Sequence, residues 1–235
     1  MKVIVIIPAA GLGTRMAPPS PGKGKSKQFA ELNGTPILIH TLRKFAASPA
    51  VAAIYIALRP DETPEFRARL EKEALRKPVE LVQGGEHRQE SVAHALAAIS
   101  ASPDDIVLVH DAVRPFVSEE IIEQVIQGAQ KYGAAIAGMP AVDTVKQVDR
   151  TAEGAVITAT IPRERVVMAQ TPQGFRYGVL KKAFDEASAD GFLGTDEASL
   201  IERAGGEVAV VMGSPRNIKI TTPADMELAE FFLKR

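Results

Sequence analysis

Residues 3 to 7 read Val-Ile-Val-Ile-Ile, an apolar run in which no alternate position is polar. A strand with one face in water alternates apolar and polar side chains, so this run predicts a strand that is buried on both faces. The stretch "DIVLVHD" at 105–111 has the same character. Strands covered on both faces occur in parallel sheets flanked by helices, which favours the α/β class.

The rest of the chain alternates between predicted strands and amphipathic helices, which indicates a Rossmann-like, mainly parallel sheet with helices on both faces. Further strands are expected near 51–58, 79–83, 134–141, 207–213 and 217–221, and helices near 35–48, 62–76, 90–100, 177–188, 196–205 and 222–235. One more helix is expected to begin at Ser118. In the first helix Thr35 is expected as the N-cap with Pro36 at the first helical position, and Thr222 with Pro223 repeats that pattern in the last helix. A chain of 235 residues that is 46% hydrophobic can bury a full core, and a single domain over 1–235 is expected.

Charge and composition exclude several classes of partner and of chemistry. The formal net charge is −1, so no overall field gathers nucleic acid or anionic membrane, and an anion must be held by a local cluster. The absence of cysteine excludes disulfides, thiolate zinc sites and a cysteine nucleophile, and it fits a reducing cytoplasm. The N-terminal apolar run is too short for a signal peptide or a membrane span, so a cytoplasmic protein without a membrane partner is expected.

The alternation of strands and helices is interrupted at about 142–162. Two β-rich runs of near-equal length flank the turn-like "RTAEG", which predicts a β-hairpin arm inserted in the α/β chain. An isolated two-stranded ribbon is marginal in water, so Val145, Val148, Val156 and Ile157 need a partner surface. A second copy of the chain supplies one, and a homodimer through the arm is expected.

The first strand runs into a loop that holds Gly11, Gly13 and Arg15. A dinucleotide fingerprint is not supported because Met16 stands where its third glycine belongs, and a P-loop at "GKS" fails because Pro19 replaces its first glycine. A loop that holds a triphosphate remains, with positive charge from Arg15, Lys23, Lys25 and Lys27. An ordinary glycine-rich turn with solvated lysines fits this stretch equally well.

Two further stretches carry candidate ligand-binding groups. Asp111 follows the second buried strand, where open α/β sheets bind ligands, and it could hold a magnesium ion that bridges phosphates, with Arg114 in reach. The alternative is a carboxylate that satisfies nearby backbone amides and an arginine on the surface. His110 is expected to be a histidine that is packed in the core or supports the site from behind its ligand-binding residues, because no other histidine or cysteine stands at metal-ligand spacing.

In "QGGEHRQESV", at 83–92, Gly84 and Gly85 expose backbone groups, Ser91 offers a hydroxyl and Arg88 adds a charge. Together these groups could read the polar edge of a base, although an ordinary turn before a capped helix has the same residues.

Eight motifs occur in one order along nearly the whole chain: "PAAGLGTRM", "KQF", "GGEHRQESV", "HDAVRPF", "VDTVK", "TPQGF", "TDEAS" and "NIKIT". As a set they resemble the 2-C-methyl-D-erythritol 4-phosphate cytidylyltransferase family of non-mevalonate isoprenoid biosynthesis. The family usually has proline before its Lys-Gln pair, whereas Ser26 stands here. Lys23 and Lys25 are therefore alternatives to Lys27, although the adjacent "QF" favours Lys27.

The resemblance implies a nucleotidyltransferase that transfers CMP from CTP to 2-C-methyl-D-erythritol 4-phosphate and releases pyrophosphate. It also implies Mg²⁺ as the divalent cation, held by Asp111. It implies catalytic roles for Arg15, Lys27, Arg163 and Lys219. Nucleotide contacts are implied for Ala9, Ala10, Gly11, Leu12, Gly13, Gly84, Gly85, Glu86, Arg88, Ser91 and Ala112. Contacts to the sugar phosphate are implied for Arg114, Thr144, Thr171 and Thr195, with Thr144 and Arg163 at the base of the arm serving the neighbouring subunit.

Two other functions are compatible with these motifs. A cytidylyltransferase for another polyol phosphate, such as ribitol 5-phosphate, would share "HDAVRPF" and "VDT". A non-catalytic nucleotide-binding module would keep the loops without turnover.

Overall fold

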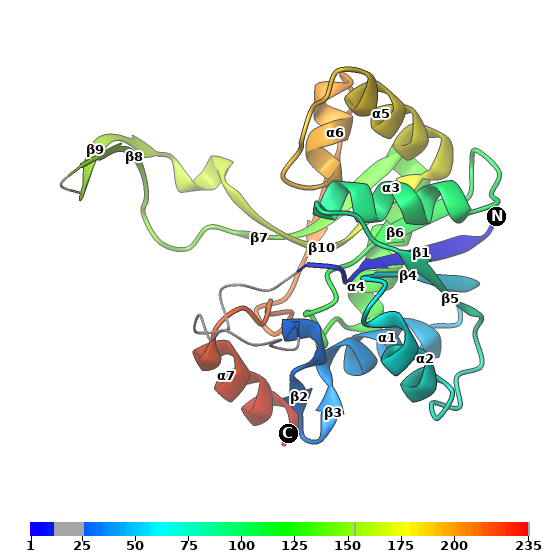
Figure 1. Ribbon diagram of the computed structural model, residues 1–235. Coiled ribbons are helices and arrows are strands. Elements are labelled where there is room, and N and C mark those ends of the chain that lie inside the picture. Colours follow the sequence, from blue (N-terminus) through cyan, green and yellow to red (C-terminus); the bar gives the residue numbers. More distant parts are fainter. Residues whose placement is uncertain (12–25, 153, 235) are drawn as a thin grey trace.

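The computed structural model describes residues 1–11, 26–152 and 154–234. Its central sheet has seven strands in the order β11-β7-β10-β6-β1-β4-β5 (Figure 1). Strand β1 (Val3–Pro8) pairs in parallel with β4 (Ala53–Leu58) on one side and with β6 (Ile106–Val109) on the other. The remaining strands are β5 (Val79–Gln83), β7 (Ala134–Pro140), β10 (Val167–Arg176) and β11 (Ala209–Met212). Among the strands described in this sheet, only β10 runs antiparallel to its neighbours, so the predicted mainly parallel sheet is confirmed.

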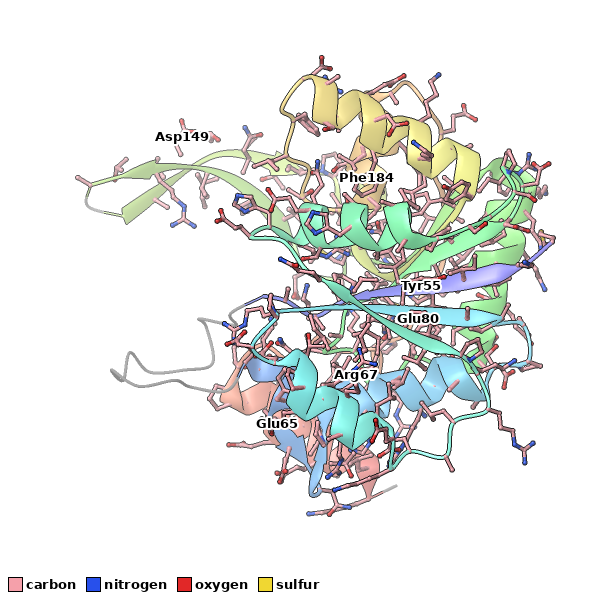
Figure 2. The ribbon with its side chains drawn as sticks, turned by 45° about the vertical axis from the view of Figure 1, so that its right-hand side comes forward. Tyr55, Glu65, Arg67, Glu80, Asp149 and Phe184 are labelled. Atoms are coloured by element: carbon pink, nitrogen blue, oxygen red, sulfur yellow. The ribbon has the colours of Figure 1, made fainter. Side chains whose placement is uncertain are left out.

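Helices cover both faces of this sheet, as the sequence predicts (Figure 1). One apolar cluster packs α1 (Ile37–Ala47), α2 (Thr63–Leu70) and α4 (Glu119–Tyr132) against the sheet. A second cluster packs α3 (Arg88–Ala98), α5 (Tyr177–Ala189) and α6 (Glu197–Arg203) against the opposite face, with Phe184 between helices and strands (Figure 2). The C-terminal helix α7 (Pro223–Leu233) covers a third, smaller cluster that contains Leu32 and Val113.

Local sequence explains several boundaries. Residues 3–7 are buried throughout, as expected for a strand covered on both faces. Ser118 caps α4 by accepting a hydrogen bond from the Ile121 amide, and Gly133 ends the helix at φ +88°, a value that suits glycine. Among the residues described, no helix combines the length and the apolar character needed to cross a membrane.

The order of the strands creates a crevice at one edge of the sheet. From β1 the chain builds outward through β4 and β5, and it then returns to place β6 on the other side of β1. Open α/β sheets bind ligands at such a reversal, beyond the carboxyl ends of the strands on either side of it. The residues after β1 and β6 therefore meet where a ligand is expected.

The predicted arm is present. Strand β8 (Val145–Thr151) pairs antiparallel with β9 (Gly154–Ile161), and the ribbon projects away from the body, with Asp149 far out along it (Figures 1 and 2). Its apolar residues stay exposed in the part of the chain that the structure describes: Val156 is 58% exposed and Ile157 is 60% exposed.

Three predictions about local structure are wrong. Helix α1 begins at Ile37 with Pro36 as its N-cap, because Thr35 and Pro36 form the short strand β3, which pairs with β2 (Glu31–Leu32). Asn33 and Gly34 connect the two strands at φ +52° and +72°, so the Asn-Gly pair is a hairpin signal that the helical interpretation overlooked.

The second error concerns "NIKIT" at 217–221, which forms no strand. Ile220 donates a hydrogen bond to the Val113 carbonyl and lies buried with Ile218 alongside, so the alternating pattern reflects packing of one segment rather than pairing in a sheet.

Strand β10 is absent from the predictions, because Pro172 and Gly174 within it are typical of turns. The expected helix over 62–76 ends at Leu70.

Candidate active site

A cavity of about 130 Å³ lies at the carboxyl ends of β1 and β6, at the reversal of strand order. It brings together most of the residues that the sequence singles out for nucleotide and phosphate binding. Its lining includes Ala9, Ala10, Gly11, Lys27, Gly85, Glu86, Arg88, Ser91, Asp111, Ala112 and Lys219.

One wall of the cavity is the turn between β5 and α3. A β-carbon on Gly84 would lie 2.3 Å from the β-carbon of Ala10, so glycine is needed for the turn to approach the end of β1. The Ser91 hydroxyl accepts from the Gly85 amide at 3.1 Å and donates to the His87 carbonyl at 3.1 Å. Its proton is therefore used to hold the turn rather than offered to a ligand in this state.

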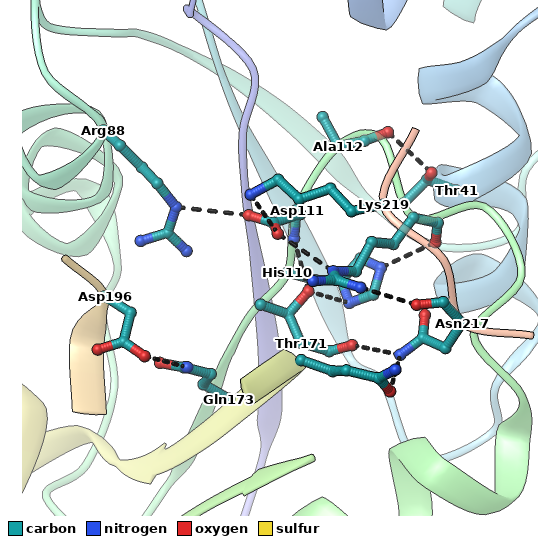
Figure 3. A network of polar contacts seen from close by, with 12 residues as sticks. Thr41, Arg88, His110, Asp111, Ala112, Thr171, Gln173, Asp196, Asn217 and Lys219 are labelled. Carbon is teal, nitrogen blue, oxygen red and sulfur yellow. Dashed lines mark hydrogen bonds and ion pairs between the residues drawn. The ribbon is translucent and has the colours of Figure 1, made fainter. Parts of the chain in front are cut away.

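Asp111 is the centre of charge in the site. Its carboxylate lies 2.9 Å from the Lys219 ammonium, 3.2 Å from Arg114 Nε and 3.5 Å from Arg88 Nε (Figure 3). Burial would raise the pKa of Asp111, but Arg88, Lys219 and Arg114 together hold that pKa well below its usual range. Asp111 is therefore ionised at neutral pH among three cations.

Arg88 links Asp111 to a second buried acid. Its Nη1 lies 2.6 and 2.8 Å from the two carboxylate oxygens of Glu197, which is 1% exposed at the start of α6. Burial lowers the pKa of Arg88, but Glu197 and Asp111 outweigh it and raise that pKa above its ordinary value. Burial raises the pKa of Glu197, against the opposing charge of Arg88. The pair fixes α3 to α6 beside the cavity.

His110 organises the residues behind Asp111. A carbonyl only accepts, so His110 Nε2 donates to the Arg114 carbonyl at 3.0 Å, and burial lowers the pKa of His110 to about 4, which leaves the ring neutral. Its Nδ1 then accepts from the Thr171 hydroxyl at 3.1 Å, and that hydroxyl accepts from the Asp111 amide at 3.0 Å (Figure 3). The expected packed histidine is confirmed, and the proton of Thr171 is committed to it.

Lys219 and Arg114 owe their positions to Asn217. The Asn217 side-chain amide is fully buried and donates to the Thr171 carbonyl at 2.8 Å, while the backbone carbonyl of Asn217 accepts from Arg114 Nη1 at 2.7 Å. These contacts hold the segment after β11 against β10, so Lys219 faces Asp111 without a strand to support it.

The remaining predicted residues lie apart from the cavity lining. Thr144 and Arg163 are exposed at the base of the arm, where Arg163 Nη1 donates to the Val142 carbonyl at 2.9 Å. Thr195 is exposed just before Asp196, the N-cap of α6. Leu12, Gly13 and Arg15 lie outside the described residues, as do the alternative lysines Lys23 and Lys25.

Sequence reasoning missed three residues that shape the site: Gln28, Glu197 and Asn217. Glu197 stands in the quoted motif "TDEAS", but an acid at a helix start is ordinarily a favourable charge for the helix dipole. Only the fold shows that its carboxylate is buried against Arg88. Among the described residues, no three His, Cys, Asp or Glu side chains are arranged to hold a metal ion.

The fold that carries this pocket is that of a Rossmann-like α/β nucleotidyltransferase. The profile of the 2-C-methyl-D-erythritol 4-phosphate cytidylyltransferase family matches residues 3–235, and the chain belongs to that family.

The chain is similar to known proteins of this family over its full length. The chain is 58% identical over 235 residues to the 2-C-methyl-D-erythritol 4-phosphate cytidylyltransferase of Acidobacterium capsulatum, covering 100% of this chain and 98% of that protein. Among solved structures, the enzyme of the same name from Francisella tularensis superposes with a TM-score of 0.82 at 37% identity, covering 98% and 99% of the two chains. The 4-diphosphocytidyl-2C-methyl-D-erythritol synthase of Anaerococcus prevotii superposes with a TM-score of 0.83 at 30% identity, covering 100% and 99%.

Proposed function

We propose that this chain transfers the cytidylyl group of CTP to 2-C-methyl-D-erythritol 4-phosphate and releases pyrophosphate, a step of non-mevalonate isoprenoid biosynthesis. The observation that carries the proposal is the cavity at the ends of β1 and β6, which gathers Lys27, Arg88, Asp111 and Lys219 in a member of this family. A pocket with more cationic than anionic side chains suits a reaction between two phosphate-bearing substrates.

The reaction needs positioning and charge stabilisation rather than a covalent intermediate. A phosphate oxygen of the polyol phosphate forms a bond to the α-phosphorus of CTP, and the bond from that phosphorus to the β-phosphate oxygen breaks in line. The electron pair leaves with pyrophosphate. Cationic groups beside the reacting phosphates must hold two anions together and stabilise the charge on the leaving group, which we assign to Lys27, Lys219 and Arg15.

The nucleotide is assigned to the walls of the same cavity. The backbone from Ala9 to Gly11, extended by Leu12 and Gly13, would take the phosphates and ribose, and the turn from Gly84 to Ser91 would take the base. Ser91 must exchange one of its two present hydrogen bonds to contact the base directly. Arg114 and Thr171 would act on the sugar phosphate from behind Asp111, and Thr171 acts there through His110 and the Asp111 amide.

The residues of the pocket fit a magnesium ion that is shared with the substrate. Asp111 supplies one ionised carboxylate, and magnesium in nucleotide enzymes is bound through one or two carboxylates together with substrate phosphates. Such an ion would neutralise charge on the phosphates and favour departure of pyrophosphate. Phosphate oxygens of the substrate would also accept hydrogen bonds from Lys219 and Arg114. These two cations would then leave Asp111, and its carboxylate would be free to bind the ion.

The arm is assigned to a homodimer. Its exposed apolar residues, among them Val148, Val156 and Ile157, have the character of an interface. Arg163 and Thr144 lie at its base, outside the lining of the chain's own pocket, and we assign them to the sugar phosphate of the neighbouring subunit. Thr195, just before α6, is also assigned to the sugar phosphate.

A single assay tests the reaction. Pyrophosphate release is measured with CTP, Mg²⁺ and either 2-C-methyl-D-erythritol 4-phosphate or ribitol 5-phosphate, with Lys27→Ala as the control for the site. We expect turnover with the methylerythritol substrate, and at least about a hundredfold lower kcat for Lys27→Ala, as loss of a positioned charge produces. A preference for ribitol 5-phosphate would show that the proposed substrate is wrong. CTP binding without turnover would show that the chain is a nucleotide-binding module rather than an enzyme.

A further inference from the structure

The turn that carries Lys27 is a single 3₁₀ turn, Lys27–Phe29, closed by a hydrogen bond from the Phe29 amide to the Ser26 carbonyl. A single 3₁₀ turn is not stable by itself. The position of this turn therefore depends on its contacts with the rest of the fold. Two of these are plain: Gln28 donates to the Ala9 carbonyl at the end of β1, and the Phe29 ring meets Phe66 of α2 edge-on at 5.9 Å.

The third contact involves the residue directly before Lys27. Ser26 is 1% exposed, and its hydroxyl donates to Glu62 Oε1 at 2.5 Å. Glu62 stands at the N-cap position of α2, yet its side chain caps no amide of its own helix. Its carboxylate, 11% exposed, accepts instead from Ser26 and from Arg59 Nη2 at 2.8 Å.

The backbone of Ser26 has φ −58° and ψ +147°, and this φ lies in the narrow range that a proline ring enforces. Proline would fix that φ through its ring. Serine leaves φ free to rotate, so here the hydrogen bond to the Glu62 carboxylate supplies the restraint. Burial of the hydroxyl also excludes Ser26 from contact with substrate, so any effect on the reaction must pass through the turn.

We propose that Ser26 and Glu62 are positioning residues that fix the direction in which Lys27 enters the phosphate pocket. The inference rests on the proposed function, because Lys27 is the group that it positions. A cation displaced by about 1 Å from its working position can lose about a hundredfold in rate, so a partial loosening gives a smaller but measurable loss. Serine with Glu62 thus does in this chain what a proline ring does by itself.

Five variants test the restraint: Ser26→Ala, Glu62→Ala, the two combined, Ser26→Pro, and Ser26→Pro with Glu62→Ala. The matched control is Asp61→Ala, which removes the other carboxylate beside Arg59, at 3.5 Å, without touching Ser26. For each variant kcat is measured by pyrophosphate release and the Kd of CTP by calorimetry, both well below the measured Tm.

We expect Ser26→Ala and Glu62→Ala each to lower kcat about tenfold and to weaken CTP binding severalfold, with no further loss when they are combined, because they break one shared contact. Ser26→Pro should restore kcat to within about twofold of wild type, and Glu62→Ala should then have little effect. Asp61→Ala should match wild type. In a Lys27→Ala background, Ser26→Ala should leave the Kd of CTP unchanged.

Wild-type kcat and Kd in Ser26→Ala would overturn the proposal, as would a loss of CTP binding that persists in the Lys27→Ala background. The latter result would mean that Ser26 supports the fold in general rather than Lys27. Failure of the proposed function looks different. If wild type binds CTP but turns over no polyol phosphate, the reaction is wrong, and the calorimetric comparison still decides whether Ser26 acts through Lys27.

Discussion

At the scale of single residues, Asp111 decides the chemistry of the pocket. The sequence predicts its place at the end of a buried strand, but not that Arg88, Arg114 and Lys219 surround it. That surrounding matters for any mutant. Because the three cations hold the pKa of Asp111 well below its usual range, the ionised carboxylate also stabilises the fold at neutral pH.

Asp111→Asn should therefore lower both turnover and stability. The asparagine amide has nearly the shape of the carboxylate but lacks the negative charge that binds a hard cation. We therefore expect kcat to fall at least about a hundredfold, and a higher Mg²⁺ concentration to be needed for half-maximal activity. Pyrophosphate release over a Mg²⁺ titration, together with Tm, measures both effects. Full turnover in a less stable protein would make Asp111 a structural residue only.

At the scale of elements, the two ends of β6 have different tasks. Asp105, directly before β6, accepts from the Lys2 amide at 2.6 Å and from the Ser102 amide at 2.8 Å, which joins the beginnings of β1 and β6. Those hydrogen bonds hold the pKa of Asp105 below its usual value. Asp105 is thus a matched control for Asp111, at the end of the strand that faces away from the pocket.

Asp105→Asn should lower the free energy of unfolding at pH 7 by about 1 to 2 kcal/mol and leave kcat unchanged, since the asparagine side chain accepts from only one of the two amides. A carboxylate whose pKa is lowered in the folded state stabilises above its unfolded pKa and ceases to do so as the pH falls. The difference between variant and wild type should therefore shrink below about pH 4. Denaturant unfolding from pH 7 to pH 3.5 tests this, and a gap that stays constant would contradict it.

Elements also differ in how far their sequence specifies them. Residues 3–7 and 106–109 are predicted correctly because burial on both faces leaves no polar residue in either run. Strand β10 escapes prediction because its ten residues include Pro172 and Gly174, which local patterns assign to turns. It is a strand because β6 and β7 offer hydrogen-bonding edges on both of its sides.

At the scale of the whole molecule, the arm raises the question of which pocket it serves. The proposed homodimer places Arg163 of one subunit at the sugar-phosphate site of the other, and residues acting in trans can complement one another. Lys27→Ala chains and Arg163→Ala chains, each nearly inactive alone, are mixed and allowed to exchange subunits. A mixed dimer then holds one site with both defects and one wild-type site.

With random exchange, half of the dimers are mixed, so about a quarter of wild-type activity should return. An arrangement in cis leaves a defect in every site and restores nothing. Subunit exchange is verified with tagged chains, and the mass in solution is measured at the assay concentration. No recovery despite exchange would overturn the assignment in trans, and a monomeric mass would overturn the dimer as well.

The sequence by itself determined the features that follow from local patterns and from motif order. These include the α/β class, the two buried strands, the helix start at Ser118, the cap at Thr222, the arm, and the family to which the chain belongs. Hydrophobic periodicity and capping act within a few residues, so they can be read along the chain.

Only the tertiary structure decided which groups meet. Arg88 and Glu197 are 109 residues apart in the chain, and Lys219 and Asp111 are 108 apart, yet both pairs are in contact. Ser26 reaches Glu62 in the same way, from a turn to a separate helix. Local sequence cannot specify such pairs, because their contact depends on strand order and on helices packed from opposite ends of the chain, and burial then sets the charge state of each group.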